Sequence, residues 1–307
     1  MASRQPGTRA LHGAPPCGRP HLDCPARSVA VKAAVSARYG SPDVLEIREV
    51  PKPAPQVGEA LVRVHAATVN RTDTGELRPH PTIKPRWPAV LFSHLMYGLL
   101  RPRRTISGLD FAGKVEAVGA GVTSLEPGER VFGMCPFLSN GAHAEYVCVP
   151  EAGPIASMPA NTRFEDAVVC EGALYANSGL KKYHVGPGHK MLIYGASGAI
   201  GTAALQLAKS RGAEVTAVVA TQHLELAKSL GADRAIDYTA QDFTRIAEQF
   251  DFIFDAVGKA SYFKCRRLLK PHGIFMATDV GPGWQNLPLM LWSAITGSNR
   301  VVVPLPE

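Results

Sequence analysis

The segment from Lys190 to Lys209 constrains the fold of this chain more than any other part of the sequence. It begins with the short apolar run KMLIY, continues through the glycine turn GASGAIG, and ends in TAALQLAK, which has helical spacing. Gly195, Gly198 and Gly201 stand three residues apart, and glycine adopts the backbone angles of a tight turn at little cost. The N–H groups at the start of a helix bind phosphate. The segment therefore predicts the pyrophosphate site of a dinucleotide-binding fold, with a G-x-x-G-x-x-G spacing in place of the commoner G-x-G-x-x-G.

Strand and helix patterns alternate downstream of this turn. We expect strands at residues 214–219, 234–237, 252–256, 273–277 and 300–303, and helices at 224–230 and 261–269. Repeated β-α units indicate a parallel, doubly wound sheet. An α/β domain that binds no nucleotide is the alternative, because a glycine triplet alone is a weak signal.

The first half of the chain has a different pattern. Short apolar runs separated by Gly and Pro predict strands at 30–35, 45–50, 60–65, 108–118, 129–133 and 142–149, typical of a β-barrel-like module. Residues 1–28 hold five prolines, four arginines and one acid without an apolar period, so we expect a disordered extension. The sequence thus predicts an α/β protein with an extension over 1–28, a β-barrel-type domain over 29–160 and a nucleotide-binding domain over 161–307.

Composition favours a soluble enzyme that binds neither nucleic acid nor a membrane. Hydrophobic residues make up 46% of the chain, enough for sizeable cores, and the net charge of +7 is not accompanied by a nucleic-acid-binding motif. The longest apolar run, residues 87–100, is too short to span a bilayer. A role at a membrane surface is the alternative for that run. Six cysteines without a C-x-x-C pair indicate reduced thiols, so we expect a cytoplasmic protein.

Several motifs together resemble one family, the medium-chain dehydrogenase/reductase superfamily, in its zinc-independent quinone-oxidoreductase-like / NAD(P)-dependent alcohol dehydrogenase branch. They are VN at 69–70 with Asp73, GLDFAG at 108–113, EAVG at 116–119, PGERVFG at 127–133, AHAEY at 142–146, GASGAIG at 195–201, LGAD at 230–233 and IDY at 236–238. The resemblance runs from about Val31 to the C-terminus. It implies a GroES-like catalytic domain, a Rossmann domain, a nicotinamide cofactor in the cleft and a homodimer.

Chains of this family continue beyond the position of Glu307 and return to the catalytic domain. We therefore expect the C-terminal return to be missing here, which would leave the catalytic domain incomplete with an unpaired barrel edge. Two hypotheses for function follow. The first is a reductase, and the second is a truncated, non-catalytic nucleotide-binding relative.

The residues argue against zinc. A catalytic zinc needs three protein ligands and an open position, and a structural zinc needs four ligands. Zinc-dependent members of the family carry a Cys in the first barrel segment and a His-Glu pair after the glycine equivalent to Gly108. In this chain residues 68–74 contain no Cys, Leu109 and Asp110 follow Gly108, and no Cys lies between Cys24 and Cys135. We expect no metal site.

Hydride transfer without a metal suits an electron-poor, small-molecule acceptor such as a quinone or an α,β-unsaturated carbonyl. The family motif places Asn70 and Asp73 as the polar residues of the catalytic cleft, and these are the catalytic candidates. Gly75 stands where several quinone reductases have a tyrosine, so the proton donor is unassigned. As an alternative, Asn70 and Asp73 only satisfy the backbone of a turn, a common role of these residue types.

The choice between NADPH and NADH depends on the end of the second strand of the nucleotide domain, where NAD sites place an acid. Residues 219–223 read VATQH and contain no acid, so NADPH is favoured; NADH remains possible because the loop also lacks Arg and Lys. The predicted cofactor-binding residues are Gly195, Ala196, Ser197, Gly198, Ala199, Ile200, Gly201, Thr221, Gln222, His223, Tyr238 and Val257.

Overall fold

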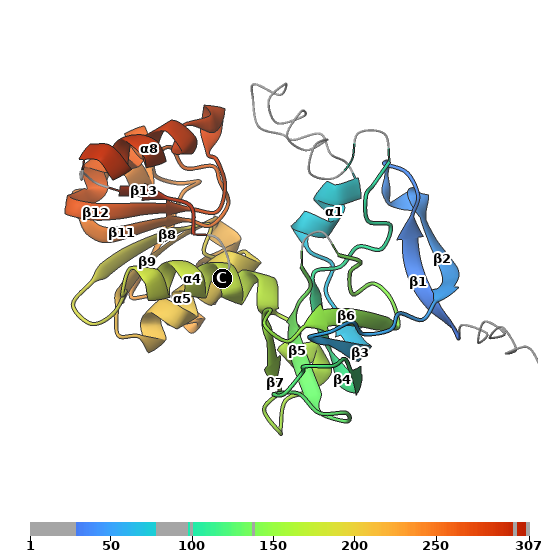
Figure 1. Ribbon diagram of the computed structural model, residues 1–307. Coiled ribbons are helices and arrows are strands. Elements are labelled where there is room, and N and C mark those ends of the chain that lie inside the picture. Colours follow the sequence, from blue (N-terminus) through green and yellow to red (C-terminus); the bar gives the residue numbers. More distant parts are fainter. Residues whose placement is uncertain (1–28, 78–97, 99–100, 137–138, 297–299, 305–307) are drawn as a thin grey trace, which may run out of the picture.

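The computed structural model describes residues 29–77, 98, 101–136, 139–296 and 300–304. The expected extension over 1–28 and nearly all of the apolar run 87–100 lie outside the described residues. Figure 1 shows an antiparallel β part, coloured blue to green, and a parallel α/β part, coloured yellow to red. This arrangement confirms the predicted fold class.

The N-terminal part contains an antiparallel sheet in the order β6-β3-β4-β5-β7. Its strands are β3 (Glu59–Ala67), β4 (Asp110–Val118), β5 (Arg130–Met134), β6 (Tyr146–Pro150) and β7 (Ile155–Ser157). A separate hairpin pairs β1 (Ala30–Ser36) with β2 (Leu45–Pro51). The strand expected over 142–149 is shorter than predicted and begins at Tyr146.

Short helices lie between and after these strands. They are the 3-10 turn η1 (Pro42–Val44), α1 (Arg71–Leu77), α3 (Phe164–Ala167) and α4 (Cys170–Lys182). The predicted domain boundary at 160/161 falls between β7 and α3. Helix α4 packs beside α5 of the C-terminal part, so it carries its first turn to the place where the two parts meet (Figure 1).

The C-terminal part is a six-stranded parallel sheet in the order β10-β9-β8-β11-β12-β13. Its strands are β8 (Lys190–Tyr194), β9 (Glu214–Val219), β10 (Arg234–Asp237), β11 (Phe250–Asp255), β12 (Leu269–Ala277) and β13 (Arg300–Val302). The order is that of a Rossmann sheet. Successive strands are added on one side of β8 as far as β10, and then on its other side from β11 to β13, so the switch point lies between β8 and β11. Ligands bind such sheets at that switch point, outside the carboxyl ends of the strands.

The helices of this part connect the strands. They are α5 (Ala199–Ser210), α6 (Leu224–Ser229), α7 (Tyr262–Cys265) and α8 (Asn286–Thr296), with 3-10 turns η2 (Thr221–His223), η3 (Phe243–Arg245), η4 (Arg266–Leu268) and η5 (Pro282–Trp284). The helix expected over 261–269 is therefore a short α7 followed by η4. Among the described residues, no helix is both long and apolar enough to cross a membrane.

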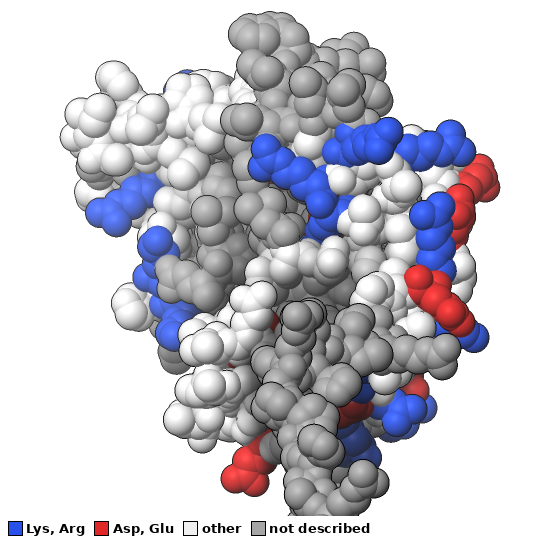
Figure 2. All heavy atoms as spheres, turned by 45° about the vertical axis from the view of Figure 1, so that its right-hand side comes forward, with Lys and Arg blue, Asp and Glu red and all other residues white. Residues whose placement is uncertain are grey.

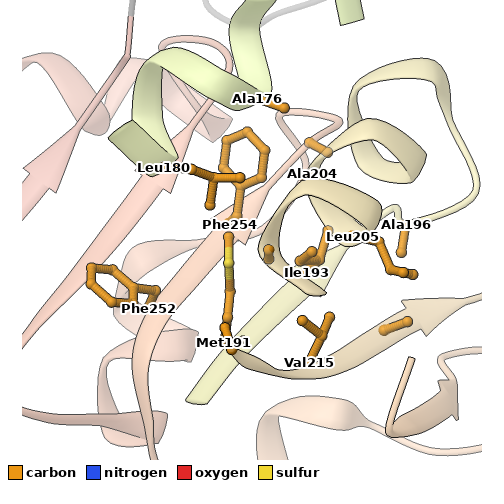
Figure 3. Packing of buried hydrophobic residues seen from close by; sticks show 14 of the residues in the cluster. Ala176, Leu180, Met191, Ile193, Ala196, Ala204, Leu205, Val215, Phe252 and Phe254 are labelled. Carbon is orange, nitrogen blue, oxygen red and sulfur yellow. The ribbon is translucent and has the colours of Figure 1, made fainter. Parts of the chain in front are cut away.

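The core explains why the glycine turn is held firmly. Met191, Leu192 and Ile193 of β8 are fully buried, as expected for a central parallel strand covered on both faces. On one face, Leu180 of α4 and Leu205 of α5 pack against this strand and β11 (Figure 3). The glycine turn thus begins at the end of a strand that is packed on both faces.

On the surface of the protein, Lys and Arg side chains outnumber Asp and Glu on the face shown in Figure 2.

Candidate functional site

A cleft of about 860 Å³ opens at the switch point of the parallel sheet, between the two parts of the chain. The N-terminal part and α4 contribute some of its lining residues, and the segments after β8, β11 and β12 contribute the others. The lining residues are Asn70, Arg71, Thr72, Glu171, Gly172, Tyr175, Gly198, Ala199, Ile200, Ala256, Val257, Gly258, Lys259, Thr278, Asp279, Gly281, Pro282 and Gly283. The cleft therefore brings the predicted catalytic segment and the predicted phosphate turn together.

The three glycines of the turn serve different purposes. Gly195 has φ +80°, and a Cβ there would lie 2.6 Å from Val257 Cγ1. A Cβ at Gly201 would lie 2.2 Å from the Gly195 carbonyl oxygen, so the protein itself requires both glycines. At Gly198 the backbone is extended (φ −82°, ψ 171°), and a Cβ would meet nothing closer than 3.7 Å. The fold therefore does not require a glycine at position 198. A ligand that approaches this backbone closely would require one, because a side chain would occupy its space.

These features fit the diphosphate of a nicotinamide dinucleotide. Helix α5 begins at Ala199, and Gly198 caps it without a side-chain hydrogen bond. The first-turn N–H groups of a helix have no intrahelical acceptor and attract anions. Gly198 and the first two residues of α5 line the cleft, as do Arg71 and Lys259. The predicted residues Gly198, Ala199, Ile200 and Val257 therefore lie on the cleft wall, whereas Gly195, Ala196, Ser197 and Gly201 are not among its lining residues.

The predicted adenosine-side residues lie outside the cleft lining. Thr221, Gln222 and His223 form the turn η2 after β9. The Tyr238 ring lies edge-to-face with that of Tyr194, with their centroids 5.9 Å apart. The side chain of His223 lies 3.3 Å from that of Gln222 (Nε2 to Nε2). These residues gather at the carboxyl ends of β9 and β10, where the position of the loop agrees with the sequence analysis.

The structure adds an acid to this loop that the sequence analysis missed. Thr221 Oγ1 donates a 2.6 Å hydrogen bond to Asp237 Oδ2, and Thr239 donates its backbone N–H and hydroxyl to Asp237 Oδ1. Hydrogen bonds from both threonines lower the pKa of the Asp237 carboxyl. Residues 219–223 contain no acid, as the sequence shows, but Asp237 lies beside them in the folded chain. The sequence could have indicated this, because Asp237 ends the predicted strand 234–237 and neighbouring parallel strands end at the same edge of a sheet.

Asn70 lines the cleft, but both of its amide hydrogens are used inside the wall. Its Nδ2 donates to Thr68 Oγ1 at 2.9 Å and to Asp110 Oδ2 at 3.0 Å. An amide nitrogen has two hydrogens. The side chain of Asn70 can therefore still accept a hydrogen bond through its oxygen but has no donor left for a substrate.

Asp73 is buried and is not among the cleft-lining residues. The residue is only 3% exposed, and its Oδ2 accepts a hydrogen bond from the backbone N–H of Asn70 at 2.7 Å. Its Oδ1 has no hydrogen-bond partner within the described part of the chain. The geometry gives Asp73 the turn-stabilising role that the sequence analysis held as the alternative, and it does not bring the carboxylate to the cleft.

The hydrogen-bonded pair of Thr72 and Glu171 lines the cleft and was not predicted from the sequence. Thr72 Oγ1 donates to Glu171 Oε1 at 2.5 Å, which joins the start of α1 to the start of α4. The backbone N–H of Glu171 donates to Asp110 Oδ1 at 2.8 Å. Burial raises the pKa of the Glu171 carboxyl and that of Asp110. Among the described residues, no three or more His, Cys, Asp and Glu side chains are grouped to hold a metal ion.

The loop that carries Val257 is held by a buried acid. Asp255 is fully buried at the end of β11, and its carboxylate accepts the N–H groups of Val257 and Ala260 at 3.1 and 2.7 Å. Burial raises the pKa of Asp255 to about 6. The loop after β11, which lines the cleft, is thus fixed by side-chain to backbone hydrogen bonds within the Rossmann part.

Known proteins share both parts of the chain. Residues 56–160 match the family model of the alcohol dehydrogenase GroES-like domain, and residues 199–302 match that of zinc-binding dehydrogenases. A zinc-type alcohol dehydrogenase-like protein of Schizosaccharomyces pombe is 32% identical over 78% of this chain and 69% of its own length. An NADPH-dependent alkenal/one oxidoreductase of Arabidopsis thaliana, a chloroplastic protein, is 30% identical over 80% of this chain and 62% of its own length.

Solved structures agree. The quinone oxidoreductase of Coxiella burnetii superimposes with a TM-score of 0.76 at 26% identity, covering 91% of this chain and 84% of that one. The antiparallel module and the Rossmann sheet are therefore parts of a shared architecture. The chain belongs to the medium-chain dehydrogenase/reductase superfamily, in its quinone-oxidoreductase-like branch.

Proposed function

We propose that this chain is an NADPH-dependent, zinc-independent oxidoreductase that transfers hydride to a quinone or an α,β-unsaturated carbonyl. The observation that carries the proposal is the cleft itself. It brings the start of α5, beside Gly198, into the same cleft as the polar side chains of Asn70, Thr72 and Glu171. A dinucleotide bound at the start of α5 would therefore share the cleft with these side chains.

The nicotinamide, when bound, supplies the hydride. The chain supplies binding and orientation, which are the main contributions of a protein to cofactor chemistry. The start of α5 holds the diphosphate, the Val257 loop fixes one wall of the cleft, and the α1 and α4 starts face the acceptor. Holding both reactants in one cleft removes much of the entropic cost of their encounter.

The acceptor class follows from the residues at the position of a catalytic metal. Leu109 is fully buried, and the side chain of Asp110 accepts hydrogen bonds from Thr68, Asn70 and the backbone of Glu171. Neither residue is free to polarise a substrate carbonyl through a metal ion. Quinones and enones suit such a site, because their reduced forms delocalise the negative charge without a Lewis acid. The names of the Arabidopsis and Coxiella relatives support this class.

The preference for NADPH rests on the loop of Thr221, Gln222 and His223, which contains no acid, and on the cofactor of the Arabidopsis relative. Asp237 opposes it, because its negative charge lies next to Thr221. The carboxylate already accepts hydrogen bonds from Thr221 and Thr239, which occupy both of its oxygens. We therefore keep NADPH as the proposed cofactor and treat Asp237 as the residue that limits the preference.

Two measurements test the proposal. Fluorescence titration should show NADPH binding, and absorbance should show NADPH oxidation by a para-quinone and an α,β-unsaturated ketone, but not by the matched saturated ketone. Gly198→Val is the matched variant that should lose both signals while its circular dichroism spectrum stays that of the wild type. Binding without oxidation by any acceptor would indicate a non-catalytic nucleotide-binding protein. Loss of neither signal in the variant would contradict the site.

A further inference from the structure

We propose that Glu171 is the acid that delivers a proton to the reduced acceptor, and that Thr72 is the positioning residue that holds its carboxyl group at the cleft. The inference rests on the proposed function and names a group that the sequence analysis left unassigned. Both residues line the cleft, and their side chains are 2.5 Å apart.

The residues predicted from the sequence cannot donate the proton. Both amide hydrogens of Asn70 are held by Thr68 and Asp110. Asp73 does not line the cleft, and Gly75 has no side chain. We therefore sought the donor among the other residues that line the cleft.

Glu171 is fixed at this wall by two contacts from different segments. Its backbone N–H donates to Asp110 Oδ1 from β4 at 2.8 Å, which anchors the first turn of α4. Its Oε1 accepts the hydroxyl of Thr72 from α1. The residue is only 8% exposed although it lines the cleft. The hydrogen bond from Thr72 thus fixes one oxygen of the carboxyl group, and we place the proton on the other, Oε2.

The surroundings raise the pKa of this carboxyl group above the ordinary glutamate value. Burial raises its pKa most, and the carboxylates of Asp110, Asp73 and Glu76 raise it further. The Thr72 hydroxyl lowers it, and the N-terminal end of α4 acts in the same direction. Glu76 is itself paired with Arg104, and the other charged groups lining the cleft are Arg71, Lys259 and Asp279. A carboxyl with a raised pKa can act as a general acid near neutral pH.

The step balances as follows for an enone. After hydride has added to the β-carbon, the π electrons of the C=C bond reside on the enolate. The O–H bond of the Glu171 carboxyl breaks, its proton adds to the α-carbon, and the product is the saturated ketone. The Glu171 carboxylate then takes a proton from water. One enone, one NADPH and one proton give one saturated ketone and one NADP⁺.

Tyr175 is the rival donor, because it lies one turn further along α4 and also lines the cleft. Its ordinary pKa is near 10, far above that of a carboxyl group. The two donors therefore predict different pH limits for the reaction. Glu171 predicts a decline in rate above a raised carboxyl pKa, and Tyr175 predicts a decline only in the alkaline range.

The experiment compares Glu171→Gln, Thr72→Val and Tyr175→Phe with the wild type, all shown to be folded by circular dichroism. Glu171→Gln keeps an acceptor for Thr72 but has no proton to give. We expect its kcat with an enone to fall about 10²- to 10⁴-fold, with an NADPH dissociation constant within about twofold of the wild type. The decline of kcat with rising pH should disappear in this variant. It should move to higher pH in Thr72→Val, because the lost hydrogen bond stabilised the carboxylate, and persist in Tyr175→Phe.

Two further readouts do not depend on rate. In the protein without cofactor, the infrared C=O stretch of a protonated carboxyl group should titrate above the ordinary glutamate range and be absent in Glu171→Gln. In D₂O, the wild type should deuterate the α-carbon of a substituted enone on one face, and Glu171→Gln should give both faces. A wild-type rate, pH profile and stereochemistry in Glu171→Gln would overturn the inference while leaving the proposed function in place. Loss of the pH dependence in Tyr175→Phe would assign the proton to the tyrosine. Failure of the wild type to reduce any acceptor would overturn the proposed function, and the inference with it.

Discussion

Gly198→Ala separates cofactor binding from folding. The backbone at Gly198 has φ −82° and ψ 171°, which any L-residue adopts, and the added Cβ would meet nothing closer than 3.7 Å. The folded state should therefore accept the methyl group. Because alanine also restricts the unfolded chain, the free energy of unfolding should stay unchanged or rise by about 0.4–1 kcal/mol.

Cofactor affinity should fall in the same variant. The methyl group would stand at the cleft wall beside the first turn of α5 and push the diphosphate away from its N–H donors. A hydrogen bond to a charged group is worth about 1.5–3 kcal/mol. Since 1.4 kcal/mol is a factor of ten, the loss of one such bond weakens NADPH binding about 10- to 150-fold.

Gly201→Ala is the matched control. Its Cβ would lie 2.2 Å from the Gly195 carbonyl oxygen and 2.7 Å from Ala196 Cα, so the backbone must move. Overpacking of this kind costs about 1–3 kcal/mol. Thermal unfolding and NADPH fluorescence titration of both variants test the reasoning. Wild-type affinity in Gly198→Ala, or a loss of stability equal to that of Gly201→Ala, would refute it.

Three other outcomes can be checked. Thr221→Asp should make NADH bind more tightly than NADPH, and Asp237→Asn should increase the preference for NADPH. Equal affinities for the two cofactors in the wild type and both variants at low salt would show that this loop does not choose between them. Arg104→Ala should lower the free energy of unfolding measured in urea by about 3–5 kcal/mol, because it leaves Glu76 buried without its partner. Arg48→Ala, which removes an exposed ion pair, should change that free energy little, and equal losses in the two variants would contradict a role for burial. Elemental analysis should find less than one zinc per chain, and a chelator should leave NADPH oxidation intact.

Much of the Rossmann part could be predicted from the sequence. Strands β8, β9 and β10 begin and end at the predicted residues, because apolar and β-branched runs are bounded there by Gly and polar residues. Strands β8 and β9 are buried on both faces over most of their length, so their apolar runs are dense, whereas the edge strand β10 buries only Ile236.

Of the helices that were not predicted, α1 and α8 were missed for different reasons. Helix α1 contains Gly75 and two threonines, which form helices poorly. Its position depends on tertiary contacts instead, through the buried Leu77 and the pair of Glu76 with Arg104. Helix α8 contains no Asp, Glu, Lys or Arg, so its sequence has no charged face to reveal a helical period, and Trp292 and Ile295 are largely exposed.

The site shows the same division. The turn proposed to bind the diphosphate is contained in one short segment, so its glycine spacing was enough to predict a turn between a strand and a helix. The pair of Thr72 and Glu171 is separated by 99 residues along the chain, so no spacing rule could find it. Thr221 and Asp237 are separated by 16 residues and meet only because β9 and β10 are neighbours in the sheet.

The acids beneath the cleft explain why one of them would carry a proton. Asp110 accepts three hydrogen bonds, from Thr68, Asn70 and the backbone of Glu171, which lower its pKa, although burial raises that pKa by more. Glu76 is paired with Arg104. Glu171 is close enough to both acids for their charges to raise its pKa, and within the described part of the chain its carboxylate accepts from the neutral hydroxyl of Thr72. Of these three acids, Glu171 is the one that lines the cleft, so its proton is the one within reach of a bound acceptor.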